Sequence, residues 1–139
     1  MIAYVDSSVL LRQVLGQPQP LTEWLSIDTP VASALVEVEC LRTLDRLRLR
    51  GRLPDEELAR RREAVFDVLR RFEIVEVGRA VLARAALPLP TTLGTLDAIH
   101  LATVTLWREH QNAEIVMATH DGALATAARA SGLSVIGML

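Results

Sequence analysis

The sequence predicts an α/β fold with a central parallel sheet of about four to five strands flanked by helices. Two observations carry this prediction. The apolar run Ile2–Val5 ends in a carboxylate, Asp6, and the run Ile115–Ala118 repeats this design shortly before Asp121. Short apolar runs that alternate with helical patterns indicate parallel strands joined by crossover helices. Ligand sites form at the carboxyl ends of such strands, so we expect Asp6 and Asp121 to converge.

The N-terminal segment predicts two strands and two short helices. Ile2–Val5 is the first strand, and a short apolar helix over Ser8–Val14 follows it. Gly16 and two nearby prolines break that helix. A second short helix is expected over Leu21–Ser26, and Pro30–Ala32 can form a brief strand.

The middle of the chain predicts two long helices. The first runs from its expected N-cap, Ser33, to about Arg50, where Gly51 stops it. Pro54 opens the second helix, which is amphipathic, highly charged and extends to about Arg71.

The remaining segments alternate again between strand and helix. Phe72–Val77 alternates in polarity like a strand, and Arg79–Leu87 follows as a short helix. The Pro88-Leu89-Pro90 segment cannot continue that helix, so a loop leads to the next one, from Thr95 to about Glu109. The last expected elements are the strand Ile115–Ala118, the helix Gly122–Ala130, a turn at Ser131-Gly132 and the strand Ser134–Ile136.

Length and composition indicate one domain over residues 1–139. The chain has 139 residues, of which 50% are hydrophobic, and this is enough to bury a core. No run approaches the roughly 18 apolar residues of a membrane span, so we expect a cytoplasmic protein that does not enter a membrane. The single cysteine, Cys40, cannot form an internal disulfide and is interpreted as a core residue.

All 15 basic residues are arginine, which excludes several kinds of site. Without lysine there is no phosphate-binding loop ending in Gly-Lys-Ser/Thr and no Schiff-base chemistry. If four of the 17 acidic residues surround a metal, the rest of the surface is mildly basic. Such a surface suits a polyanionic substrate without requiring one.

Four acidic residues are candidates for that site, and each has a simpler explanation as well. Asp6 is the hardest to explain otherwise, because it follows a buried strand and precedes two serines. Asp121 could be a plain N-cap of the helix that begins at Gly122. Asp97 could only complement the N-terminus of its own helix. His100, one turn after Asp97, is more readily a hydrogen-bonded core residue than a ligand.

The fourth candidate lies on the helix that follows Ser33. Glu37 and Glu39 are about 200° apart on a helix and cannot share a face. Periodicity does not choose between them, and Glu39 could simply pair with Arg42 on a solvated surface. Two or more of these carboxylates held together would repel one another unless a proton or a divalent cation lay between them.

Four short motifs, taken in order, resemble a PIN domain, and specifically a VapC-type toxin ribonuclease. They are the strand-Asp-Ser-Ser start, Ser-Ala-Leu-Val-Glu-Val-Glu-Cys-Leu-Arg around Glu39, Thr-Leu-Asp-Ala-Ile-His-Leu-Ala around Asp97, and Ala-Thr-His-Asp-Gly-Ala-Leu around Asp121. Each motif is short, but the ordered set is specific and covers nearly the whole chain. The resemblance implies a three-layer α/β/α fold and favours Glu39 over Glu37.

The resemblance also implies the chemistry of the site. Asp6, Glu39, Asp97 and Asp121 would form the catalytic set, with Asp6, Asp97 and Asp121 around Mg²⁺ or Mn²⁺, which prefer oxygen ligands. The cation would activate water for attack on a phosphodiester. Ser7 and Thr119 would orient carboxylates or water through hydrogen bonds.

Substrate binding is less determined by the sequence. Arg42 and Arg46 belong to the densest basic region and are our candidates for contact with RNA phosphates. The alternative is an ordinary solvated helical face neutralised by neighbouring acids. Aromatic residues are few, so no platform for stacking bases is evident.

The implied partners are an RNA substrate, such as tRNA or rRNA, a cognate antitoxin and a second copy of the chain. Two other functions stay open. One is another PIN or flap-type metal nuclease that acts in RNA processing or on DNA. The other is a non-catalytic module that binds partners through its acidic pocket.

Overall fold

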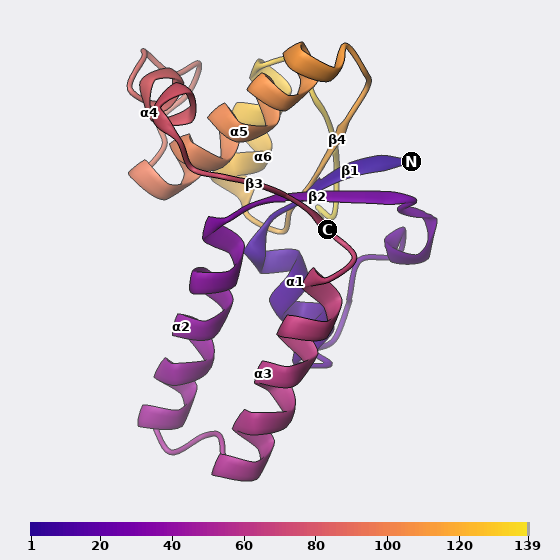
Figure 1. The fold of residues 1–139 in the computed structure, drawn as a ribbon, viewed down its shortest axis with the longest axis vertical. Coiled ribbons are helices and arrows are strands. Elements are labelled where there is room, and N and C mark those ends of the chain that lie inside the picture. The colour runs from indigo at the N-terminus through magenta and orange to yellow at the C-terminus, as the bar shows by residue number, and fades with distance from the viewer. Residues whose placement is uncertain (139) are drawn as a thin grey trace.

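Five parallel strands form the centre of the fold in the computed structural model, which describes residues 1–138 (Figure 1). The strands are β1 (Ile2–Val5), β2 (Thr29–Ser33), β3 (Glu73–Val75), β4 (Val116–Ala118) and β5 (Ser134–Ile136). Their order across the sheet is β3-β2-β1-β4-β5, and each neighbouring pair is parallel. The predicted fold class is therefore confirmed.

Six helices cover the two faces of this sheet, which makes three layers (Figure 1). They are α1 (Ser7–Val14), α2 (Leu35–Leu49), α3 (Asp55–Leu69), α4 (Arg79–Ala85), α5 (Thr95–Gln111) and α6 (Gly122–Ala130). Helices α1, α2 and α3 pack on one face against Ala3 and Val5, whereas α5 and α6 pack on the other face against Tyr4. Successive strand residues point to opposite faces, so β1 supplies both cores. Helix α4 packs on α5 through a smaller cluster.

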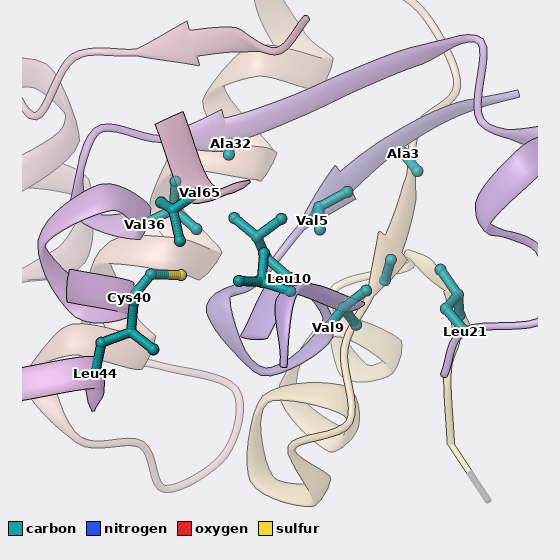
Figure 2. Close-up of a cluster of buried hydrophobic side chains, with 12 residues drawn as sticks. Ala3, Val5, Val9, Leu10, Leu21, Ala32, Val36, Cys40, Leu44 and Val65 are labelled. Carbon is teal, nitrogen blue, oxygen red and sulfur yellow. The ribbon is translucent and has the colours of Figure 1, made fainter. Parts of the chain in front are cut away.

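The core on the first face holds Cys40, as Figure 2 shows. Its side chain is fully buried and lies near Val36 and Leu44 of α2 and Val65 of α3. Burial, followed by the charges of nearby carboxylates, raises the pKa of the thiol to about 12. A thiol that keeps its proton is a poor nucleophile, so Cys40 has the structural role that the sequence predicted.

Strand order determines where the site forms. From the central strand β1 the chain builds β2 and β3 on one side and β4 and β5 on the other. The carboxyl ends of β1 and β4 are therefore adjacent at the point where the direction of winding reverses, which is the usual place for a ligand site in such sheets. The backbone N–H of Asp6 donates to the carbonyl of Ala118 at 3.1 Å, so the residues after both strands start side by side.

Most elements begin and end within a few residues of the bounds predicted from the sequence, and one expected helix is wrong. The short helix expected over Leu21–Ser26 is only a single 3-10 turn at Trp24–Ser26. Ser33 is not the N-cap residue but ends β2, and Ala34 precedes the helix. The Ser33 hydroxyl still accepts from the backbone N–H of Leu35 at 3.1 Å, so it performs part of the capping role from one residue earlier. Over residues 1–138, no helix combines the length and the apolar character that a membrane span needs.

Candidate functional site

Asp6 is held by hydrogen bonds on both carboxylate oxygens. It is 5% exposed and caps α1, where Oδ1 accepts from the backbone N–H of Ser8 at 3.0 Å and from the Ser7 hydroxyl at 3.2 Å. Oδ2 accepts from the Ser8 hydroxyl at 2.8 Å and from the Thr119 hydroxyl. A buried carboxylate is tolerated only with such partners, and here they also fix its orientation. Sequence reasoning identified Ser7 and Thr119 but missed Ser8, whose signal was its place directly after Asp6-Ser7.

Thr119 links the ends of β1 and β4. Its fully buried hydroxyl donates to Asp6, accepts from the backbone N–H of Asp121 at 3.0 Å and lies 3.5 Å from the Ser8 hydroxyl. Asp121 is exposed and caps α6, because its Oδ1 accepts from the backbone N–H of Leu124 at 2.9 Å. The capping role considered for Asp121 is therefore present, and its second carboxylate oxygen is not used by that cap.

We expect Thr119→Val to lower the free energy of unfolding by about 1–3 kcal/mol, because the isosteric change leaves buried polar groups without a partner. Thr119→Ser should retain most of the stability. The matched control is Thr126→Val on α6, an exposed position whose hydroxyl donates to the carbonyl of Gly122. Chemical denaturation of the three variants measures the effect, and equal losses for Thr119→Val and Thr126→Val would contradict it.

Asp97 lies in the first turn of α5 and interacts electrostatically with the other acids. Its pKa is raised by partial burial and then by the negative charges of Asp121 and Asp6, with a smaller contribution from Glu39. The four predicted acids therefore share one electrostatic neighbourhood, although they come from four different segments. Within residues 1–138 no hydrogen-bond donor engages the Asp97 side chain, which leaves both its oxygens available to a ligand.

Glu39 is the acid on α2 that faces this neighbourhood, while Glu37 is exposed. Its Oε1 lies 2.6 Å from Nε2 of His100, whose Nδ1 lies 2.6 Å from the hydroxyl of Tyr4. The alternative of a surface pair between Glu39 and Arg42 does not form, because Arg42 instead pairs with Asp45 on its own helix. His100 is 1% exposed and hydrogen-bonded on both nitrogens, as the simpler interpretation of a core histidine predicted.

Opposing effects act on the His100 ring. Burial lowers its pKa, but the hydrogen bond with Glu39 and the charges of Glu39, Asp6 and Asp97 outweigh burial, so the pKa is raised. The raised pKa of His100 is further evidence that Glu39, Asp6 and Asp97 lie near one another.

The donor set suits a hard divalent cation. Four carboxylates with no thiol or clustered imidazole are the ligand type that Mg²⁺ and Mn²⁺ prefer, usually with one or two direct carboxylates and several waters. Across residues 1–138, no three acidic, histidine or cysteine side chains are already gathered tightly enough to enclose an ion. Carboxylates repel one another and approach closely only when a cation or a proton separates them.

The two arginines proposed for substrate lie beside Glu39. Arg42 and Arg46 line a groove of about 370 Å³ on α2, together with Ser7, Leu35, Val38, Glu39, Thr43 and Leu96. The Arg42 guanidinium lies 3.0 Å from Asp45, which Arg48 also contacts at 2.8 Å. Arg46 donates only to the Thr43 hydroxyl at 3.1 Å among the residues described, so its charge is the more available of the two. Farther along, Arg60 and Arg61 both pair with Glu57, as expected of a solvated helical face.

Comparisons with known proteins identify the family of this chain. Residues 3–130 match the profile of the PIN domain. The chain is 33% identical to "Ribonuclease VapC46" of Mycobacterium tuberculosis (strain ATCC 25618 / H37Rv), over 141 aligned residues that cover 96% of this chain and 95% of the relative.

Two solved structures share the fold. One is FitAcB from Neisseria gonorrhoeae, with a TM-score of 0.71 and 20% identity over 99% of this chain and 97% of that chain. The other is a toxin-antitoxin complex from Klebsiella pneumoniae, with a TM-score of 0.66 and 17% identity over 96% of this chain and 95% of that chain. Because the profile spans most of the sequence and the curated relative aligns along nearly its whole length, the chain belongs to the PIN domain family.

Proposed function

We propose that this protein is a divalent-metal-dependent endoribonuclease and the toxin of a type II toxin-antitoxin pair. The observation that carries the proposal is the set of four carboxylates at the carboxyl edge of the sheet. Four hydrogen bonds hold Asp6 in place, whereas no donor from residues 1–138 binds Asp97. The name of the 33% identical relative, a ribonuclease, supports the choice of RNA over other phosphodiesters. The active unit is a single nuclease domain over residues 1–139 that acts in the cytoplasm.

Asp6 and Asp97 would hold Mg²⁺ or Mn²⁺, with Asp121 at its edge. The ion would supply positive charge that favours ionisation of a water nucleophile and stabilises the charge of the reacting phosphate. Ser7, Ser8 and Thr119 keep the carboxylate of Asp6 in one orientation, so it is preorganised before substrate arrives.

Glu39 and Asp121 orient water through the carboxylate oxygens that their own hydrogen bonds leave unused. Arg46, with Arg42 beside it, binds RNA phosphates along the groove next to Glu39. Phosphate contacts of this kind position the strand without reading its sequence, so recognition depends on the shape and local context of RNA such as tRNA or rRNA.

The partners we propose are a cognate antitoxin and a second copy of the chain. Support for the antitoxin comes from the toxin-antitoxin complex among the structures of the same fold. An antitoxin that places an arginine among the four carboxylates would neutralise their charge as a cation does, and would thereby block the site.

The experiment that tests the function uses purified protein without its antitoxin. Incubation with tRNA, rRNA and a DNA duplex of matched length is carried out in Mn²⁺, in Mg²⁺ and in excess EDTA. We expect discrete RNA fragments with either metal, and no cleavage in EDTA or of DNA. Cleavage that persists in EDTA would contradict the metal requirement, preferential cleavage of DNA would favour a flap-type nuclease, and no cleavage of any RNA would contradict the ribonuclease.

A further inference from the structure

A chain of hydrogen bonds ends on Glu39, which lines the groove, whereas its other two members, Tyr4 and His100, do not line it. Tyr4 of β1, His100 of α5 and Glu39 of α2 are joined by two contacts of 2.6 Å. Tyr4 is fully buried and His100 is 1% exposed, so no substrate reaches either ring. This series of hydrogen bonds therefore acts on the site only through Glu39.

The direction of the hydrogen bonds follows from the groups themselves. A phenol keeps its proton at neutral pH, so the Tyr4 hydroxyl donates to Nδ1 when the His100 ring is neutral. The ring proton then lies on Nε2 and faces Glu39. A doubly protonated ring also carries a proton at Nε2, so His100 donates to an ionised Glu39 in either state.

Glu39 needs such a partner more than the other acids do. Asp6 and Asp121 have short side chains that bind backbone N–H groups of the helices they cap. Glu39 projects from the second turn of α2 on a longer side chain, and among residues 1–138 no donor other than His100 reaches its carboxylate. Because Oε1 is occupied by Nε2 of His100, the geometry leaves Oε2 for the site.

We propose that His100 is the positioning residue for Glu39, and that Tyr4 fixes the ring that does it. This inference rests on the proposed ribonuclease function and extends it, because it assigns to a fully buried pair the orientation of one catalytic acid. His100 itself does not contact RNA.

The test is a double-mutant cycle between positions 100 and 39, measured as kcat and KM for RNA cleavage at saturating Mn²⁺. We expect His100→Leu to lower kcat about 10- to 100-fold and to leave KM within about twofold. His100→Gln retains an N–H donor at a similar reach and should recover kcat to within about fivefold of the wild type. When Glu39 is already Gln, adding His100→Leu should lower kcat no more than about twofold further, because both changes remove the same interaction.

Val104→Ala is the control for a merely structural role. Val104 is fully buried on the same helix and belongs to the apolar core. Its replacement should lower the midpoint of thermal unfolding while leaving kcat within about twofold, and its effect should add to that of Glu39→Gln. If His100→Leu does not fold, Tyr4→Phe keeps the test intact, because it should lower kcat about threefold to tenfold and show the same lack of additivity with Glu39→Gln.

The outcomes separate this inference from the proposed function. A wild type that cleaves RNA, together with a His100→Leu variant that behaves like Val104→Ala, would overturn the role of His100 and leave the ribonuclease in place. Nitrogen-15 spectra of the metal-free protein supply a readout without catalysis. They should show a proton on Nε2 of His100, and an unprotonated Nε2 would overturn the inference even if no RNA is cleaved.

Discussion

Replacement of Asp97 by asparagine is expected to lower the rate of RNA cleavage by at least about 1,000-fold. Among the four acids, Asp97 is the one whose oxygens accept no hydrogen bond from residues 1–138, so both oxygens are free to bind a cation. An amide keeps the shape of the side chain but removes the charge, and a loss of about 4 kcal/mol in transition-state stabilisation corresponds to this factor. Single-turnover cleavage of RNA in Mn²⁺ measures it.

The control for this prediction is Asp55→Asn. Asp55 also lies in the first turn of a long helix, α3, but it is exposed and does not line the groove beside Glu39. Cleavage by this variant should stay within about twofold of the wild type. A rate for Asp97→Asn that falls no further than the rate for Asp55→Asn would show that Asp97 only complements its helix.

The same Asp97→Asn protein should be slightly more stable than the wild type in EDTA at neutral pH. The folded-state pKa of Asp97 is raised, first by burial and then by the charges of Asp121 and Asp6, so folding favours its protonated form. Its ionised form therefore lowers the stability once the pH exceeds the raised pKa. That cost shrinks as the pH falls and disappears below the unfolded pKa of about 3.9. Because the carboxyl is partly exposed, we expect a rise in the unfolding midpoint of only about 1–3 °C.

Among the seven glycines, Gly137→Ala should be the most destabilising replacement by alanine, lowering the free energy of unfolding by about 3 kcal/mol. Gly137 follows β5 with φ of +99°, a conformation that side chains rarely adopt. A Cβ there would lie 2.6 Å from the carbonyl oxygen of Thr119 and 3.2 Å from its carbonyl carbon. Both atoms belong to backbone, so the ends of β4 and β5 must separate to admit the methyl group.

Separation of the ends of β4 and β5 should also reduce the rate of RNA cleavage, because Thr119 orients Asp6. The backbone N–H of Thr119 donates to the carbonyl of Ile136 at 3.1 Å, and the carbonyl of Gly137 lies 2.6 Å from Nδ1 of His120. We expect cleavage to fall about tenfold or more at a temperature where the variant is still folded.

Gly132→Ala isolates the contribution of backbone strain. Gly132 has φ of +80°, but an added Cβ there would have no closer neighbour than the end of the Arg108 side chain, 3.9 Å away. This change should cost about 1 kcal/mol with no effect on the cleavage rate. Thermal unfolding in EDTA compares the two variants, and equal midpoints would contradict the close approach at Thr119.

Much of the fold could be predicted from local patterns, because strands and long helices carry a periodic signal. The strands at 2–5 and 134–136 have the expected bounds, and α6 matches its prediction. The helix predicted over residues 21–26 is wrong, because a helix of one or two turns has few hydrogen bonds and tertiary contacts decide its form. Neither Glu37 nor Glu39 could be chosen from helical periodicity, and only the family resemblance favoured Glu39.

By itself, the sequence determined that Asp6 and Asp121 would share one edge of a parallel sheet. This follows because each comes just after a buried strand, and parallel strands end on the same side. Only the tertiary structure decided that β1 and β4 are neighbours, that Ser8 and Thr119 share Asp6, and that His100 joins Tyr4 to Glu39. The two contacts of His100 connect positions 96 and 61 residues apart. Contacts over such separations depend on how the helices pack on the sheet, and no local periodicity in the sequence encodes that packing.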